Sequence, residues 1–152
     1  MTAREMQKHL FTGRWRGVRA PSVKEHQLQI QFVSLMKWAL RPDVIMFHVP
    51  NGEVRDKVAA AKLKAMGVLP GVSDLVFVWK KYWEDSEGSH TAPGILFLEL
   101  KRLDGRLTSE QAAFGLALLV VGAEFAVAHS IDEAVEAVQS RGLLRSDRQI
   151  SR

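Results

Sequence analysis

Two acidic side chains and one lysine stand at spacings that suit metal-assisted chemistry. Asp74 opens one apolar run, and Glu99 and Lys101 are separated by a single residue within another. Residues i and i+2 of a strand project from the same face, so Glu99 and Lys101 share a face while Leu98 and Leu100 take the other. Charges inside so apolar a segment are costly unless they are paired or functional. Two carboxylates and one ammonium group can therefore converge on one point.

Such a point suits a hard divalent cation. Mg²⁺ takes oxygen ligands and keeps several of its waters, which a pair of carboxylates allows. The lysine can then orient or help to deprotonate a water, or stabilise charge on a phosphate. The alternative is an ordinary surface ion pair between Glu99 and Lys101, with Asp74 merely starting a strand. The Glu-x-Lys spacing alone favours this alternative.

The first element expected to support these groups is a long helix. Ser22 is suited to cap it, and Glu25 stands at the third position beyond, as a capping box requires. Apolar residues then recur on one stripe as far as about Leu40, the helical period. Pro42 ends the helix.

The rest of the chain alternates between strand and helix patterns. Strands are predicted at 44–49, 74–79, 94–101 and 124–129, helices at 54–66, 108–121 and 130–139, and a polar connection at 82–94. The order α-β-α-β-β-α-β-α predicts an α/β fold with a mixed central sheet flanked by helices.

The helix predicted at 108–121 has two notable features. Thr108 and Gln111 have capping-box spacing. The segment Phe114–Val121 is almost without polar residues, so it is expected to be buried on nearly all sides. In so small a domain, that burial suggests a subunit interface.

Composition indicates one ordinary globular domain. A chain of 152 residues that is 47% hydrophobic can bury a core of its own. Cys is absent, which excludes disulfides, thiolate zinc sites and a cysteine nucleophile. No apolar run is long enough to span a bilayer, and no apolar segment follows the charged N-terminus. We therefore expect a cytoplasmic protein with no membrane partner.

Charge divides the chain into a basic arm at 1–21, a domain at 22–142 and a polar tail at 143–152. The first 24 residues hold one acidic residue, Glu5, and the net charge of the whole chain is +4. The arm either contacts the phosphates of a nucleic acid or serves only to keep the protein in solution. Trp15, an aromatic ring among cations, favours nucleic acid. The basic residues of this segment are Arg4, Lys8, Arg14, Arg16, Arg19 and Lys24.

The segments before Asp74 allow simpler interpretations. The loop 67–71 is glycine-rich but lacks the Gly-Lys-Ser/Thr ending of a phosphate-binding P-loop and precedes a strand, so nucleotide binding is not expected. In the helix before it, Lys57, Lys62 and Lys64 form either a solvated face or a track for a phosphate backbone.

Two histidines end predicted strands. His48 and His129 have no partner at metal-ligand spacing, which favours structural roles for both. His48, together with Asn51 in the turn that follows, could also reach DNA at the rim of the site.

In order and spacing, these residues resemble the PD-(D/E)xK nuclease superfamily and, more closely, the stand-alone virus-type replication-repair nuclease (VRR-NUC) domains. The resemblance extends from about Glu25 to Ala137. Each motif is weak, but their order and spacing together are fairly specific. Ser73 departs from the family, which usually has a proline there; the proline shapes only the loop. The motifs are Val49-Pro50-Asn51-Gly52, Gly67 to Asp74, Glu99-Leu100-Lys101-Arg102, Leu107-Thr108-Ser109-Glu110-Gln111 and Gly122 to Val127.

The resemblance implies a restriction-endonuclease-like fold and a metal site. Asp74 and Glu99 would be ligands of Mg²⁺ or Mn²⁺, with the Leu100 carbonyl as a backbone ligand. Glu25 matches the helical acid that completes the metal shell in this family. Its other interpretation is the capping-box acid described above, and the two roles can coexist.

The same resemblance implies catalytic roles for two further residues. Lys101 would activate water or stabilise a phosphate, and Gln111 would position water or a phosphate. Helix capping is the open alternative for Gln111. The activity implied is a divalent-metal-dependent DNA endonuclease.

The expected substrate is branched DNA such as a four-way junction, because a homodimer presents two equivalent sites to paired strands. The expected setting is replication or repair in a bacterial or phage-infected cell. The alternative is a non-catalytic DNA-binding or assembly module with the same fold. The complete Asp–Glu–Lys set favours the enzyme, since an idle site has no physical need to retain three mutually costly charges.

Overall fold

The computed structural model of the chain describes residues 24–50 and 57–147. The predicted basic arm at 1–21, together with Ser22 and Asn51, lies outside the described residues. No helix in the described part of the chain has the length and apolarity to cross a membrane.

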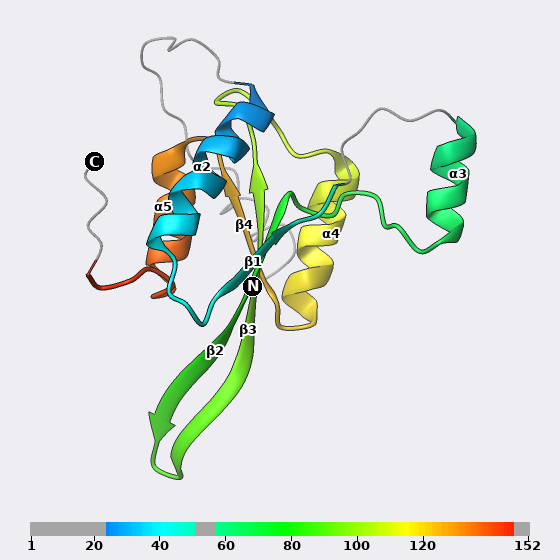
Figure 1. Cartoon of the computed structure of the whole chain (residues 1–152). Helices are drawn as coiled ribbons and strands as arrows, with labels where there is room; N and C mark the ends of the chain where they lie inside the picture. Colours follow the sequence, from blue (N-terminus) through cyan, green and yellow to red (C-terminus); the bar gives the residue numbers. More distant parts are fainter. Residues whose placement is uncertain (1–23, 51–56, 148–152) are drawn as a thin grey trace.

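A four-stranded mixed sheet forms the centre of the domain (Figure 1). Its strands lie side by side in chain order. Neighbours are antiparallel from β1 to β3, and β4 is parallel to β3. The strands are β1 (Ile45–His48), β2 (Leu75–Asp85), β3 (Gly88–Leu100) and β4 (Glu124–Ala128).

Helices flank the sheet as predicted. α2 (Glu25–Ala39) and α5 (Ile131–Gln139) cover one face, α4 (Ser109–Val120) lies on the other, and α3 (Lys57–Ala65) stands apart from the body (Figure 1). The order α-β-α-β-β-α-β-α is the predicted one. The mixed α/β architecture is therefore confirmed.

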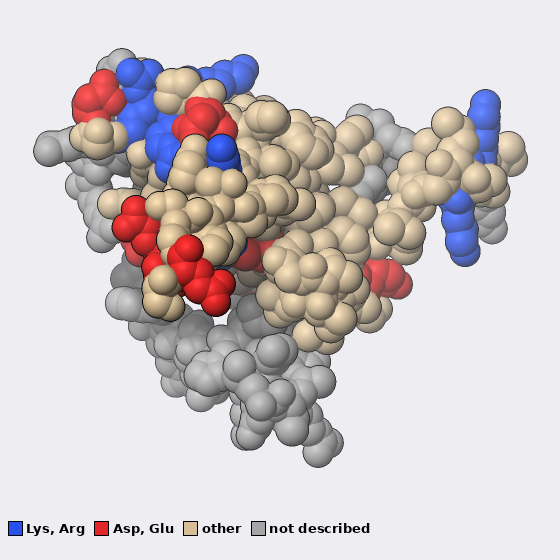
Figure 2. All heavy atoms as spheres, turned by 90° about the horizontal axis from the view of Figure 1, so that it is seen from below, with Lys and Arg blue, Asp and Glu red and all other residues tan. Residues whose placement is uncertain are grey.

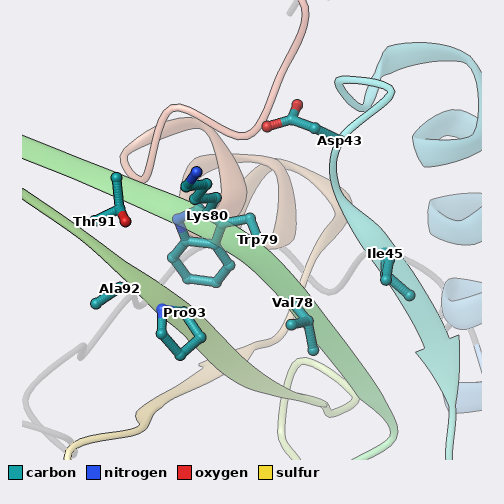
Figure 3. Close-up of a pocket in the computed structure, with 8 residues that line it drawn as sticks. All are labelled: Asp43, Ile45, Val78, Trp79, Lys80, Thr91, Ala92 and Pro93. Carbon is teal, nitrogen blue, oxygen red and sulfur yellow. The ribbon is translucent and has the colours of Figure 1, made fainter.

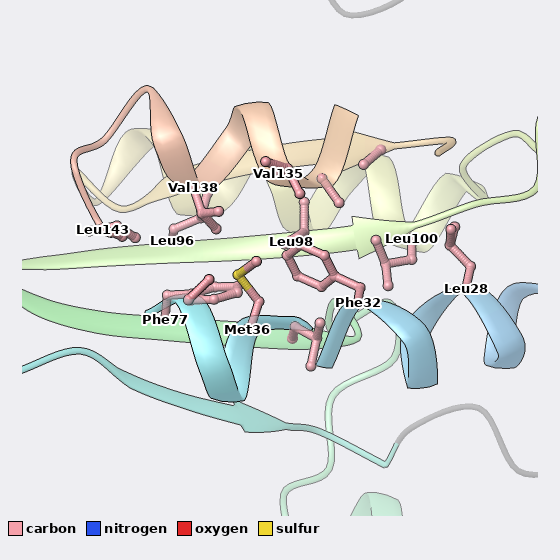
Figure 4. Close-up of a cluster of buried hydrophobic side chains, with 14 of the residues drawn as sticks. Leu28, Phe32, Met36, Phe77, Leu96, Leu98, Leu100, Val135, Val138 and Leu143 are labelled. Atoms are coloured by element: carbon pink, nitrogen blue, oxygen red, sulfur yellow. The ribbon is translucent and has the colours of Figure 1, made fainter. Parts of the chain in front are cut away.

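The hydrophobic core lies between the sheet and the helices α2 and α5 (Figure 4). Alternate residues of β2 and β3 point into it, because successive side chains of a strand project to opposite faces. The rings of Phe32 and Phe77 meet edge to face, with centroids 6.3 Å apart. The cluster consists of Leu28, Phe32, Met36, Ala39, Leu75, Phe77, Trp79, Leu96, Leu98, Leu100, Ala128, Ala134, Val135, Val138 and Leu143.

The long helix α2 begins later than predicted. Its N-cap is Lys24, which makes no side-chain capping bond, and Glu25 is the first helical residue. The predicted capping box with Ser22 as the cap is therefore wrong, because Glu25 does not stand at the third position of the helix. The Glu25 carboxylate still lies in the first turn, where its negative charge interacts favourably with the positive end of the helix dipole.

The predicted polar connection at 82–94 is also wrong. β2 continues to Asp85 and β3 starts at Gly88, so this segment forms a two-stranded hairpin that extends beyond the other strands (Figure 1). Its stability comes from cross-strand pairs rather than from a core. The rings of Trp83 and His90 stack with centroids 5.2 Å apart. Both faces are solvated, so the segment lacks the alternation that would have indicated a strand.

Burial of the segment 114–121 on nearly all sides is wrong for the single chain. Only Gly115 and Leu118 of α4 are buried, while Val120 and Val121 are 87% and 78% exposed. Within the described part of the chain, no further layer covers the outer face of this helix, so that face is exposed there. The result is an exposed apolar surface at the end of α4.

The packed domain continues past the predicted boundary at residue 142. Leu143 is completely buried, and its carbonyl accepts a hydrogen bond from the Arg41 backbone N–H at 2.9 Å. The Arg145 N–H then donates to the Ala39 carbonyl, also at 2.9 Å. Leu143 and Leu144 are apolar residues in an otherwise polar tail, and they pack against the core near the end of α2.

Candidate active site

Asp74 stands where the ends of three strands meet. It directly precedes β2, one step beyond the pair Leu75–Leu98, so it lies beside Glu99 of β3. Its Oδ2 accepts a hydrogen bond from the Leu100 backbone N–H at 2.9 Å, and its carbonyl accepts one from the Val49 N–H at 3.1 Å. Hydrogen bonds from β3 and from the end of β1 therefore hold this residue in place.

Glu99 is buried and paired. The residue is 1% exposed, and its Oε1 lies 2.9 Å from the Lys101 Nζ. Lys101 is itself only 7% exposed. The alternative of an ordinary surface pair is therefore wrong. Removing each of these two charges from water costs roughly several kcal/mol. The stability of the fold alone does not require a buried ion pair at this position.

The second oxygen of Glu99 differs from the first. Oε2 is buried and receives no hydrogen bond from the residues that the structure describes. A buried anionic oxygen without a donor is unfavourable unless something else compensates it. A cation bound there would do so, and this atom therefore fits a metal ligand.

The pKa shifts of Glu99 and Asp74 also favour a bound cation. Burial raises the pKa of Glu99 to about 7, and the negative charge of Asp74 adds to this, while Lys101 opposes it. Burial also raises the pKa of Asp74, against the Leu100 N–H and Lys101. The charge of Asp74 thus disfavours ionisation of Glu99, and burial disfavours ionisation of both carboxyl groups; a divalent cation would compensate both.

Glu25 contributes charge but does not complete a cluster. It is exposed at the start of α2, and its negative charge raises the pKa of both Asp74 and Glu99. Within residues 24–50 and 57–147, no three acidic or histidine side chains come together closely enough to hold a metal ion. The structure therefore brings together two of the three predicted acidic ligands, and the role of Glu25 stays a prediction.

Gln111 caps α4 and also contacts Glu99, while its role in positioning water or a phosphate stays a prediction. Its Oε1 accepts a hydrogen bond from the Thr108 N–H at 2.9 Å, and the Thr108 Oγ1 accepts one from the Gln111 N–H at 3.2 Å, so the capping box is confirmed. Its Nε2 donates to the Glu99 Oε1 at 2.5 Å. The cap fixes the amide in the orientation that reaches Glu99.

Gly71 allows the start of α4 to approach the loop that carries Asp74. Its φ is +78°, and a Cβ placed there would lie 2.5 Å from the backbone carbonyl of Glu110. Only glycine tolerates both the conformation and the contact. The loop and the first turn of α4 are therefore in direct backbone contact, which places Gln111 beside the carboxylates. The sequence showed the glycine but not what it packs against.

The two histidines differ in their surroundings. The His129 Nε2 lies 3.2 Å from the Gly105 carbonyl, and its backbone N–H donates to Glu133. These contacts agree with a structural role. His48 is exposed at the end of β1, and its Nδ1 lies 2.7 Å from the Asp74 carbonyl oxygen. It therefore contacts the site directly.

Two of the three lysines predicted to share a helix face are solvated, and the side chain of Lys57 lies outside the described part. Lys62 and Lys64 are exposed, and basic side chains project from two sides of this helix, at the right of Figure 2. Both interpretations made from the sequence, a solvated face and a phosphate track, remain open.

A shallow pocket of about 360 Å³ lies elsewhere, at the base of the β2–β3 hairpin (Figure 3). Its lining is largely apolar and includes none of the predicted site residues, so we do not assign the chemistry to it. The lining residues are Asp43, Ile45, Val78, Trp79, Lys80, Thr91, Ala92 and Pro93.

The fold is similar to that of a solved structure described as a VRR_NUC domain protein. The two share 22% sequence identity with a TM-score of 0.57, over 81% of this chain and 89% of the other. No protein-family model and no curated protein matches the sequence. At this identity the similarity establishes the fold alone. The predicted restriction-endonuclease-like architecture, a mixed sheet flanked by helices, is confirmed.

Proposed function

We propose that this protein is a divalent-metal-dependent DNA endonuclease of the VRR-NUC type. One observation carries the proposal. The buried Glu99, next to Asp74, has one oxygen held by Lys101 and Gln111, and its other oxygen receives no hydrogen bond from residues 24–50 and 57–147. This arrangement combines an anionic site for a metal with a cation positioned for phosphate chemistry. The solved VRR_NUC domain protein, which has a similar fold, supports the assignment.

Asp74 and Glu99 would hold Mg²⁺ or Mn²⁺, with the Leu100 carbonyl as a backbone ligand and Glu25 completing the shell. The donor set fits, since hard cations take carboxylate and carbonyl oxygens. When bound, the ion polarises the scissile phosphate and lowers the pKa of a bound water.

The protein residues have separate tasks in this reaction. The Lys101 ammonium orients the attacking water or stabilises charge on the phosphate, and the Gln111 amide holds the Glu99 carboxylate in place. Water attacks phosphorus in line, and its bond to phosphorus forms as the bond to the 3′-oxygen breaks. The products are a 5′-phosphate and a 3′-hydroxyl.

A cleavage assay on a mixed panel of DNA structures tests the proposal. The panel contains linear duplex, single strands, flaps and four-way junctions, each with Mg²⁺, with Mn²⁺ or with chelator. We expect cleavage with metal only, leaving ends that a ligase can rejoin. Binding of DNA without cleavage under every condition would favour the alternative, a non-catalytic module.

Assembly gives a first prediction. Exposed apolar side chains lie at the end of α4 (Val120 and its C-cap Val121) and on β1 (Ile45 and Phe47). We expect a homodimer at micromolar concentration that prefers junctions to linear duplex. Analytical ultracentrifugation measures the mass, and Val120→Lys should shift it toward the monomer. A monomeric wild type, or equal cutting of junction and linear duplex, would contradict this part of the account.

The basic arm gives a second prediction. If residues 1–20 contact phosphates, their deletion will weaken DNA binding and flatten its dependence on salt, because fewer counterions are released. Fluorescence anisotropy from about 50 to 200 mM salt measures this slope. The four arginines make a matched control possible: changing them to lysine keeps the charge and should keep the slope. If the deletion leaves the salt dependence of DNA binding unchanged, the arm serves only to keep the protein in solution.

A further inference from the structure

The histidine that ends β1 contacts the peptide group of Asp74. The Nδ1 of His48 lies 2.7 Å from the Asp74 carbonyl oxygen, which also accepts the Val49 N–H at 3.1 Å. A carbonyl oxygen only accepts hydrogen bonds, so the proton of the imidazole must be on Nδ1. Two donors on one oxygen fix the orientation of this peptide plane.

Helix α2 contacts the same ring nitrogen. The Nε2 atom of the Gln29 side chain lies 2.8 Å from His48 Nδ1. Since Nδ1 carries a proton, we assign the Gln29 amide oxygen, rather than Nε2, to the position facing it, which takes half a turn about the last side-chain bond. The amide oxygen and the Asp74 carbonyl oxygen then share the one Nδ1 proton. Gln29 thus orients the imidazole, and the imidazole orients Asp74.

The contacts on Asp74 come from both of its neighbouring strands. Its carboxylate Oδ2 is bound by the Leu100 N–H of β3, and its carbonyl is bound from the end of β1. The second carboxylate oxygen, Oδ1, receives no hydrogen bond from the residues that the structure describes and can take a ligand. A residue held at its backbone and at one carboxylate oxygen can present the other in a fixed position, which a metal site requires.

We propose that His48 is a positioning residue that holds the metal ligand Asp74 through the hydrogen bond from its Nδ1. The inference rests on the proposed function. It assigns His48 a role through Nδ1, in place of contact with DNA. Direct contact with DNA would use Nε2, since Nδ1 is already occupied.

Two amide substitutions separate these roles. The amide nitrogen of asparagine can occupy the place of Nδ1, whereas that of glutamine reaches the place of Nε2. His48→Asn therefore keeps the proposed donor, His48→Gln keeps only a donor for DNA, and His48→Ala keeps neither. Titration of Mn²⁺ into the four full-length proteins by calorimetry measures the metal site directly, without DNA.

We expect His48→Asn to bind Mn²⁺ within about threefold of wild type, and His48→Gln and His48→Ala to bind about 10- to 100-fold more weakly, as for other residues that orient metal ligands. Single-turnover cleavage should follow the same order. Thermal unfolding without metal is the control for folding: a general structural role would lower the melting temperature of all the variants together and would not give this order.

Two outcomes overturn the inference alone. The first is a wild type that binds Mn²⁺ together with a His48→Ala protein that binds it equally well. The second is the reverse order, with His48→Gln active and His48→Asn impaired, which would place the role on Nε2. A wild type that neither binds Mn²⁺ nor cleaves DNA overturns the proposed function and this inference with it.

Discussion

Replacement of Lys101 by alanine is expected to abolish DNA cleavage and to leave Mn²⁺ binding intact. The ammonium cannot ligate a cation, but it lies 2.9 Å from the Glu99 Oε1, where it can act on water or phosphate. Loss of such a group lowers the rate by about 10²- to 10⁴-fold. Metal affinity should stay the same or rise, because a neighbouring positive charge is removed. Single-turnover cleavage and calorimetry, both at pH 8, measure the two quantities.

Lys101→Met is the matched control for this variant. Lys101 is buried, so alanine also removes the packing of its alkyl stem, whereas methionine retains most of it. Both variants should lose cleavage equally if the ammonium is the group that matters. DNA affinity should fall little, since one phosphate contact among many is lost. Cleavage by Lys101→Met within about tenfold of wild type would exclude the proposed role.

Replacement of Glu99 by glutamine is expected to remove both metal binding and cleavage. The neutral amide has nearly the same shape and can still accept hydrogen bonds from Lys101 and Gln111, so the fold should be kept. It lacks the anionic oxygen that a hard cation requires. Calorimetric titration with Mn²⁺ should show no binding at concentrations that saturate the wild type.

Glu87→Gln provides the control for charge. This glutamate lies exposed in the turn of the β2–β3 hairpin, so the substitution makes the same change of charge away from the site. It should bind Mn²⁺ and cleave DNA as the wild type does. If Glu99→Gln binds Mn²⁺ with wild-type affinity, the metal site lies elsewhere in the chain.

The elements that support the site could be predicted from the sequence where their hydrophobic pattern is strong. The stripe through Leu28, Phe32 and Met36 predicts the buried face of α2, and these residues are in the core. The pairing of Thr108 with Gln111 predicts the cap of α4. Both signals are local, since they depend on residues within a few turns of one another.

Features that depend on distant residues could not be predicted in this way. The hydrogen bond from Gln111 to Glu99, the contact of Gly71 with Glu110 and that of His48 with Asp74 each join different elements. Sequence periodicity carries no information about such contacts. The same reason explains the error over α4: an apolar helix predicts burial, but the pattern does not show whether the covering layer belongs to the same chain.

The resemblance of the motifs to VRR-NUC domains predicted more of the site than periodicity did. Strand spacing had already grouped Asp74, Glu99 and Lys101, and the resemblance gave them roles and added Gln111. The structure brings all four together. For Glu25 it predicted a ligand, whereas the structure gives only an electrostatic influence on Asp74 and Glu99.

The rate of DNA cleavage in a single turnover, compared between wild type and Glu99→Gln, tests the central claim most directly. The two proteins are purified in parallel and incubated with a four-way junction and Mn²⁺. The proposed site predicts that wild type cleaves only with metal and that Glu99→Gln is slower by at least about 100-fold. Equal rates for the two proteins, or cleavage by wild type that persists with chelator, would contradict it.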